Sequence, residues 1–165
     1  MSKNSTEDKR LHPRCACCSA QTQCLLFSQI PVHALSCIQA VVQVTRRPRA
    51  DTIFREGEPA RGFFIVRSGW AKVFTSRPDG RKAVQAIAGP GHILGLIEVL
   101  TGSRLQSSAQ ALEECEVEYV NAAEFSQILA TNPDLRIQLL EAAHRQIQNA
   151  RKELVDLAAA PAPAP

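Results

Sequence analysis

Four of the six cysteines in this chain fall within eleven consecutive positions, in the segment RCACCSAQTQC at residues 14–24. Single cysteines scattered through a domain usually act as small buried hydrophobes. A cluster in a polar segment instead indicates disulfide bonds, redox chemistry or metal ligation. The four thiols are therefore the first candidates for chemistry in this sequence.

The compartment decides between these chemistries. The N-terminal segment MSKNSTEDKRLHPR has no apolar core of the kind a signal peptide needs, and no stretch reaches the roughly 18 apolar residues of a membrane span. We expect a cytoplasmic protein with no membrane partner. Because the cytoplasm is reducing, a disulfide framework is disfavoured, and metal ligation or redox sensing is the better interpretation of the thiols.

Composition limits the size and class of the protein. With 165 residues, 45% hydrophobic and 21% charged, the chain can form one globular domain of roughly 100 to 150 residues with appendages. The formal net charge of +3 is smaller than a dedicated nucleic-acid-binding domain usually carries. No Ser/His/Asp set, acid/base carboxylate pair or phosphate loop is recognisable, so we expect no enzyme.

The elements that must position the thiols can be read from periodicity. Apolar residues on one helical face predict a helix over residues 32–44. Short β-rich segments follow, separated by turn signals such as Pro78-Asp79-Gly80 and Gly89-Pro90-Gly91, and they indicate a mainly β fold, an antiparallel jelly roll with flanking helices. The expected strands are DTIF, GFFIVRS, WAKVFTS, KAVQAIA, SAQAL and CEVEYV. Phe63, Phe64 and Trp70 lie in these segments and are expected to be core aromatics.

Two helices are expected after the strands. Asn121 is a plausible N-cap for a short helix around residues 122–130, and Asn132 or Asp134 can start a longer one. The longer helix carries apolar residues at alternating spacings of three and four, which is the seam of a coiled coil and predicts dimerisation; packing of the seam on its own β domain is the alternative. The seam residues are Leu140, Ala143, Ile147, Ala150, Leu154 and Leu157.

These features divide the chain into five expected parts. They are a flexible arm at 1–14, a cysteine-rich segment at 15–31, a β-roll sensor domain at 32–131, a dimerisation helix at 132–158 and an Ala/Pro tail at 159–165.

The segments FREGEPARGFFIVRSGWAKVF, RPDGRKAVQAIAGPGHILGLIEVLTG and SSAQALEECEVEYV, in this order, resemble the effector domain of the Crp/Fnr superfamily of bacterial transcription regulators. That domain is a cyclic-nucleotide-binding-like jelly roll. Cys15, Cys18 and Cys24, spaced C-x2-C-x5-C, are similar to the N-terminal cysteine motif of the Fnr branch, which holds an oxygen-labile [4Fe-4S] cluster. The resemblance implies a sensory domain that reads oxygen or redox state through such a cluster and thereby tunes dimerisation.

The chemistry of the segment agrees with this resemblance. Closely spaced thiolates on an irregular loop can wrap a cubane cluster, and Lys9, Arg10 and Arg14 would offset its negative charge. Zinc held by Cys15, Cys17, Cys18 and Cys24, or with His12, is an alternative, as are four reduced thiols without a metal.

The fourth cluster ligand departs from the Fnr pattern. The family takes its last cysteine from the strand that corresponds to ECEVEYV, and the matching position here is Glu118, three residues after Cys115. Residues an odd number apart on a strand face opposite sides, so only one of the two can face the cluster. Cys115 is the candidate ligand, with buried packing as its alternative role; Glu118 and Cys17 are the substitutes. Cys37 is expected in the core.

Cyclic-nucleotide binding, or another small-molecule effector, is the competing function. The Crp branch holds the nucleotide phosphate with an arginine that precedes a serine and an alanine. Ser107 stands at that arginine position here, so the bidentate phosphate contact is missing. Arg104 could replace it only if its loop were rearranged, and Glu98 could still meet a ribose.

The resemblance also implies a DNA-binding partner domain. Crp/Fnr regulators normally continue from the seam helix into a winged helix-turn-helix, which this sequence does not include. We therefore expect that this chain alone does not bind operator DNA, and that it forms a homodimer or a heterodimer with a full-length Crp/Fnr regulator.

Overall fold

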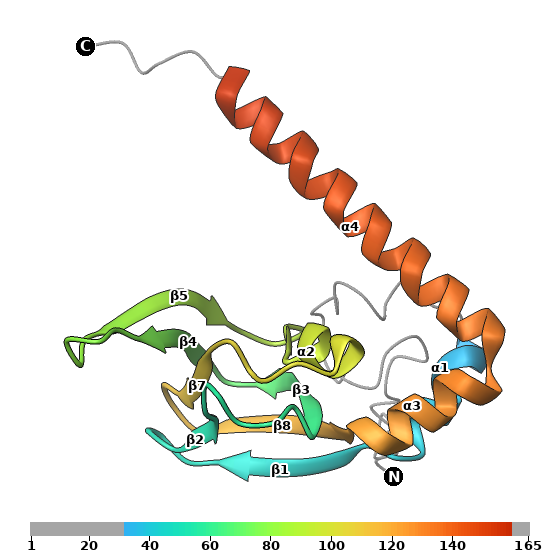
Figure 1. Cartoon of the computed structure of the whole chain (residues 1–165), viewed down its shortest axis with the longest axis horizontal. Coiled ribbons are helices and arrows are strands. Elements are labelled where there is room, and N and C mark those ends of the chain that lie inside the picture. The colour runs from blue at the N-terminus through green and yellow to red at the C-terminus, as the bar shows by residue number, and fades with distance from the viewer. Residues whose placement is uncertain (1–31, 160–165) are drawn as a thin grey trace, which may run out of the picture.

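Eight short strands form two antiparallel sheets in the computed structural model, which describes residues 32–159 (Figure 1). The first sheet has the strand order β1-β8-β3-β6 and the second has the order β2-β7-β4-β5. The strands are β1 (Gln43–Arg47), β2 (Thr52–Phe54), β3 (Gly62–Ser68), β4 (Ala71–Ser76), β5 (Lys82–Ala88), β6 (Ile93–Leu94), β7 (Ser108–Ala111) and β8 (Cys115–Asn121). The expected antiparallel jelly-roll class is confirmed.

Four helices accompany the sheets. They are α1 (Val32–Gln39), α2 (Leu96–Thr101), α3 (Ala122–Thr131) and α4 (Pro133–Ala159). The expected cap at Asn121 is present, since its side-chain oxygen accepts hydrogen bonds from the backbone N–H groups of Ala123 at 2.8 Å and Glu124 at 3.3 Å. α4 packs mainly against α3 and α1 and extends away from the sheets (Figure 1).

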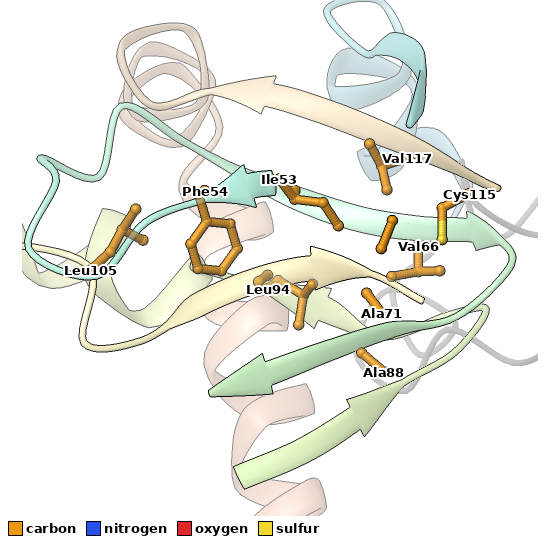
Figure 2. Close-up of a cluster of buried hydrophobic side chains, with 11 residues drawn as sticks. Ile53, Phe54, Val66, Ala71, Ala88, Leu94, Leu105, Cys115 and Val117 are labelled. Carbon is orange, nitrogen blue, oxygen red and sulfur yellow. The ribbon is translucent and has the colours of Figure 1, made fainter. Parts of the chain in front are cut away.

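The core has two layers because β3 and β8 are buried on both faces. One layer fills the space between the two sheets, and Figure 2 shows its side chains meeting there. The second layer lies between the first sheet and the helices, where the rings of Phe63 and Phe125 meet edge to face at 4.9 Å. It comprises Ile38, Phe63, Ile65, Leu96, Val120, Phe125, Leu135, Leu139 and Ala142.

Three expectations about local structure were wrong. The first helix ends at Gln39 instead of residue 44, because the β-branched run that follows favours a strand and becomes β1. The short helix α2 was not expected. Trp70 is 48% exposed and precedes β4, so it is not a core aromatic; its ring lies where a Cβ at Gly89 would be.

Candidate functional site

The cysteine-rich segment falls outside the described residues. Cys15, Cys17, Cys18 and Cys24 therefore stay candidates on sequence grounds, together with His12. Within residues 32–159 no group of three or more His, Cys, Asp or Glu side chains could hold a metal ion. The described part of the chain contributes two of the candidate ligands, Cys115 and Glu118.

Cys115 lies between the two sheets, at the start of β8 (Figure 2). Its thiol is buried and contacts the carbonyl oxygens of Trp70 at 3.1 Å and Glu113 at 3.4 Å. Burial raises the pKa of this thiol, and the two hydrogen bonds oppose that shift only in part. The thiol is thus held in its neutral form inside the sandwich, which agrees with the buried-packing role.

Glu118 lies on the other face of the same strand, as the odd spacing predicts. It stands opposite Val44 of β1 and Ile65 of β3, and its face of the sheet also carries Val120, which packs toward the helices. Only 2% of its surface is exposed. Carboxylates are almost never this buried unless they are paired or coordinate a cation, so Glu118 is the most unusual residue of this strand.

The residues that correspond to the expected nucleotide site lie at the start of α2 and at the start of β7. Gly95 has φ 83° and leads into α2, while Ser108 begins β7 and is buried. The Ser108 hydroxyl accepts a hydrogen bond from the backbone N–H of Glu56 at 2.9 Å. The Glu56 carboxylate in turn accepts one from the backbone N–H of Ser76 at 2.9 Å. The backbone of Glu56 thus contacts the serine that would cap a phosphate, and its carboxylate is held at Ser76.

Glu56, Ser76 and Ser108 border a polar pocket of about 500 Å³. Arg55 and Lys82 also line it, so two cations and one carboxylate face the same space. Arg104 does not, because its guanidinium donates a hydrogen bond to the carbonyl of Gly57 at 2.8 Å. Arg104 is otherwise exposed to solvent.

The seam of α4 is exposed where its side chains are described. Leu140, Leu154 and Leu157 face outward, whereas Ala143 is half-buried beside an apolar groove. The side chains of Ile147 and Ala150 are not among those described. The alternative, in which the whole seam packs on its own β domain, is therefore wrong for the three leucines. None of the helices in residues 32–159 combines the length and apolar character that a membrane span needs.

Two exposed residues of α2 were missed. Ile97 and Leu100 lie on one face of this helix and border the same groove as Leu140. Their three-residue spacing within LIEVLT was the available signal, but six residues are too few for periodicity to be read with certainty.

The two-sheet jelly roll carries a short helix before β7 and a long helix after the roll. The family model of the cyclic nucleotide-binding domain matches residues 44–132, which is more than half of the chain. The chain belongs to the cyclic nucleotide-binding domain family.

Among curated proteins, the chain is similar to transcription regulators. It is 27% identical to the CRP-like cAMP-activated global transcriptional regulator of Mycobacterium tuberculosis, over 80% of this chain and 59% of that protein. It is 31% identical to the transcriptional activator protein anr of Pseudomonas aeruginosa, over 82% of this chain and 55% of that protein. The chain thus spans little more than half the length of these relatives.

Solved structures show the same fold. The N-terminal domain of a transcriptional regulator from Streptomyces coelicolor superposes with a TM-score of 0.68 at 23% identity, over 78% of this chain and 91% of that one. The sensor domain of the regulator DNR from Pseudomonas aeruginosa gives 0.63 at 19% identity, over 78% and 87% of the two chains.

Proposed function

We propose that this chain is the sensory domain of a Crp/Fnr-type transcription regulator, which reads oxygen or redox state through a [4Fe-4S] cluster and thereby tunes dimerisation. Cys15, Cys18 and Cys24 would supply three ligands. The observation that carries the proposal is the combination of this C-x2-C-x5-C segment with a cyclic-nucleotide-binding fold whose β8 holds a buried carboxylate. In this function the protein works in the cytoplasm and performs no catalysis.

Glu118 suits the fourth ligand position better than Cys115. The Cys115 thiol is directed between the sheets and bonded to two carbonyl groups, so it would have to leave the core to meet a cluster. The Glu118 carboxylate lies on the face that the helices cover. α1 packs against α3 and α4 on that side and follows the cysteine-rich segment directly in sequence. This proposal therefore assigns the fourth ligand to Glu118.

The chain's own residues would tune such a site. The cluster, when bound, supplies the group that reacts with oxygen. Lys9, Arg10 and Arg14 offset the negative charge of the cluster and its thiolates and favour the deprotonated form of nearby thiols. Burial of Glu118 keeps water away from the carboxylate and strengthens its attraction to a cationic metal.

Oxygen exposure tests the sensing function. Protein prepared without oxygen should show the broad visible absorption of an iron–sulfur cluster, and admitting air should bleach it while shifting the sedimentation coefficient between dimer and monomer. If the cluster bleaches while the sedimentation coefficient stays the same, the proposal that the cluster tunes dimerisation is contradicted. An absorption spectrum that lacks iron–sulfur features before air is admitted would contradict the cluster, and zinc at one atom per chain would favour the alternative metal.

Binding of a cyclic nucleotide is the second candidate function, favoured by the family and by the two cations in the polar pocket. Ser107 stands in place of the paired arginine, and Glu56 adds a carboxylate to the same pocket that Ser108 lines. Loss of a charge-assisted hydrogen bond costs roughly 1.5 to 3 kcal/mol. We therefore expect no calorimetric signal with cyclic AMP or cyclic GMP at micromolar concentrations; heat of binding there would promote this function.

Dimerisation and DNA binding complete the proposal. The partner is a second copy of this chain or a full-length Crp/Fnr regulator, joined through the α4 seam. The formal net charge of +3 gives the chain only a weak attraction to the phosphates of DNA. The chain alone is proposed not to bind operator DNA; a sequence-specific gel shift at physiological salt, without a partner protein, would contradict this.

A further inference from the structure

The polar pocket of about 500 Å³ lies on the second sheet, beside the hairpin that β4 and β5 form. This volume falls within the roughly 300 to 1,000 Å³ that small-molecule sites occupy. Neither Cys115 nor Glu118 lines the pocket, so it is separate from the proposed cluster site. Its polar side chains include Thr52, Arg55, Glu56, Ser76, Lys82 and Gln110.

The pocket opens on the outward face of the second sheet. Ala109 of β7 belongs to the core between the sheets, so its neighbours Ser108 and Gln110 face the other way. Ala71 of β4 also lies between the sheets (Figure 2), and Phe74, an odd number of residues along the strand, faces outward. A ligand in this pocket would therefore lie on the outside of the β roll and not in its interior.

The floor of the pocket is an aromatic ring with two ammonium groups beside it. The Nζ of Lys82 lies 4.6 Å from the centre of the Phe74 ring, and the Nζ of Lys72 lies 5.5 Å from the same centre. These cation–π contacts hold both ammonium groups close to the surface of the sheet. Because two like charges beside one ring repel each other, an anion near them would be stabilised.

The cations that line the pocket have no acidic partner. Neither Arg55 nor Lys82 forms an ion pair with another residue in the range 32–159. The hairpin segment from residue 71 to residue 88 has a net charge of +3, which equals that of the whole chain, so the remaining charges balance. Positive potential is thus concentrated beside this pocket. The charged residues of the hairpin are Lys72, Arg77, Arg81 and Lys82 against Asp79.

The pocket also offers a hydrogen-bond acceptor. One oxygen of the Glu56 carboxylate accepts a hydrogen bond from the backbone N–H of Ser76 at 2.9 Å, while no residue in the range 32–159 donates to the other oxygen. A ligand that is only anionic would be repelled by this carboxylate. A ligand that also carries hydroxyl groups can donate a charge-assisted hydrogen bond to it.

We propose that this pocket binds a small phosphorylated sugar, whose phosphate is held between Arg55 and Lys82 and whose hydroxyl group donates to Glu56. The planar guanidinium can meet two phosphate oxygens at once, and the ammonium adds a compact positive charge. This inference goes beyond the proposed function, because it assigns a ligand to a part of the β roll that has no role in cluster binding or dimerisation.

Isothermal titration calorimetry of the full chain tests the proposal. The probes are glucose 6-phosphate, ribose 5-phosphate, glucose and inorganic phosphate. At least one of the two sugar phosphates should bind at micromolar concentrations, with inorganic phosphate at least about tenfold weaker, since it lacks the hydroxyl contact, and glucose not binding. No heat of binding with either sugar phosphate, or an equal affinity for inorganic phosphate, would overturn the proposal.

Two neighbouring cations provide a matched pair of variants. Lys82→Met keeps the apolar stem over Phe74 and removes the charge, so it should weaken binding of the sugar phosphate roughly 10- to 150-fold. Arg81→Met removes a charge from the adjacent position, which does not line the pocket and has a side chain that is 84% exposed, so it should bind as the wild type does. Equal losses in the two variants would indicate only general attraction to the hairpin and overturn the site. Both variants should keep the circular dichroism spectrum of the wild type.

Glu56→Gln tests the hydroxyl contact. The glutamine keeps an acceptor for the backbone N–H of Ser76 but removes the negative charge. Binding of the sugar phosphate should weaken and binding of inorganic phosphate should strengthen, so the ratio of the two affinities should fall. An unchanged ratio would overturn the assignment of Glu56.

The inference and the proposed function fail separately. Binding of the sugar phosphate should be the same with and without air, because neither Cys115 nor Glu118 lines the pocket. A chain that carries no cluster but binds the sugar phosphate would contradict only the proposed function. Displacement of the bound sugar phosphate by cyclic AMP would assign the pocket to the second candidate function and overturn this inference.

Discussion

Cys115 and Glu118 illustrate how three residues of separation on one strand produce opposite chemical environments. The thiol of Cys115 contacts two carbonyl groups between the sheets, whereas the carboxylate of Glu118 lies among the side chains that face the helices. The neutral Cys115 thiol is accommodated in the core by its two carbonyl contacts and needs no metal there. The assignment of the ligand role to Glu118 therefore rests on the face of β8 that it occupies, which is the face that the helices cover.

Paired substitutions test this assignment. Glu118→Gln keeps the shape of the side chain but removes the charge, so we expect the stability of the reconstituted cluster to fall by more than the roughly tenfold that loss of an outer-shell contact costs. Cys115→Ser should leave the cluster content unchanged. Iron and sulfide content after anaerobic gel filtration measures both effects, and the reverse pattern would return the ligand role to Cys115.

Burial of Cys115 also predicts a pH dependence of stability. Because burial raises the pKa of this thiol above its ordinary value of 9.0, the folded chain keeps the proton at pH values where the unfolded chain loses it. This contribution is fully present below pH 9 and is lost as the pH rises through the higher folded value.

The free energy of unfolding, measured in urea between pH 8 and pH 10.5, should therefore fall above pH 9. The fall should be shallower in Cys115→Ala, while Tyr119, whose pKa burial also raises, adds to it in both proteins. An equal slope in the wild type and the variant would contradict this description of the thiol.

At the scale of the elements, the turn between β3 and β4 depends on Gly69. This residue has φ 78°, and a Cβ there would overlap the carbonyl oxygen of Glu114 and lie 2.9 Å from the Cys115 sulfur. Gly80 has a similar φ of 80°, but a Cβ there would meet no atom within 4 Å. Alanine at Gly80 would therefore suffer backbone strain alone, whereas alanine at Gly69 would suffer both backbone strain and steric overlap.

Gly80→Ala should lower the free energy of unfolding by about 1 to 2 kcal/mol, the cost of the left-handed backbone for a residue with a Cβ. Gly69→Ala should cost roughly 1 to 3 kcal/mol more, because the turn must also move away from Glu114. Urea denaturation of both variants measures the difference, and equal losses would show that the turn relaxes freely.

Helices and strands were predicted well where the pattern of apolar residues was long, and poorly where that pattern was short. The strand segments from DTIF to CEVEYV appear at their expected places, and Asn121 caps α3 as expected. α2 was missed because one and a half turns give no periodicity. The predicted first helix ran on to residue 44, into the start of β1, because Val41 and Val42 continue the apolar face of α1. Burial of Glu118 could not be foreseen, since it depends on which side of β8 the helices cover.

At the scale of the whole molecule, we propose that α4 determines the oligomeric state. Leu154 and Val155 are neighbours with nearly equal exposure, 66% and 65%, but only Leu154 lies on the seam. A charge at either position should leave the fold of the single chain unchanged, because neither side chain is in the core.

Leu154→Glu should convert the dimer to a monomer, since burying a glutamate in a seam is strongly unfavourable, whereas Val155→Glu should remain dimeric. Analytical ultracentrifugation at micromolar concentration distinguishes the two. If the two variants behave alike, the seam from Leu140 to Leu157 is not the interface.

We propose that this cyclic-nucleotide-binding fold senses through a cysteine-ligated iron–sulfur cluster. The most direct measurement is the iron, acid-labile sulfide and zinc content of the full chain purified without oxygen, together with its Mössbauer spectrum. We expect about four irons and four sulfides per chain, as a [4Fe-4S] cluster requires, and the same measurement on Cys18→Ser should find neither. One zinc per chain without iron or sulfide, or a metal-free chain under the same conditions, would contradict it.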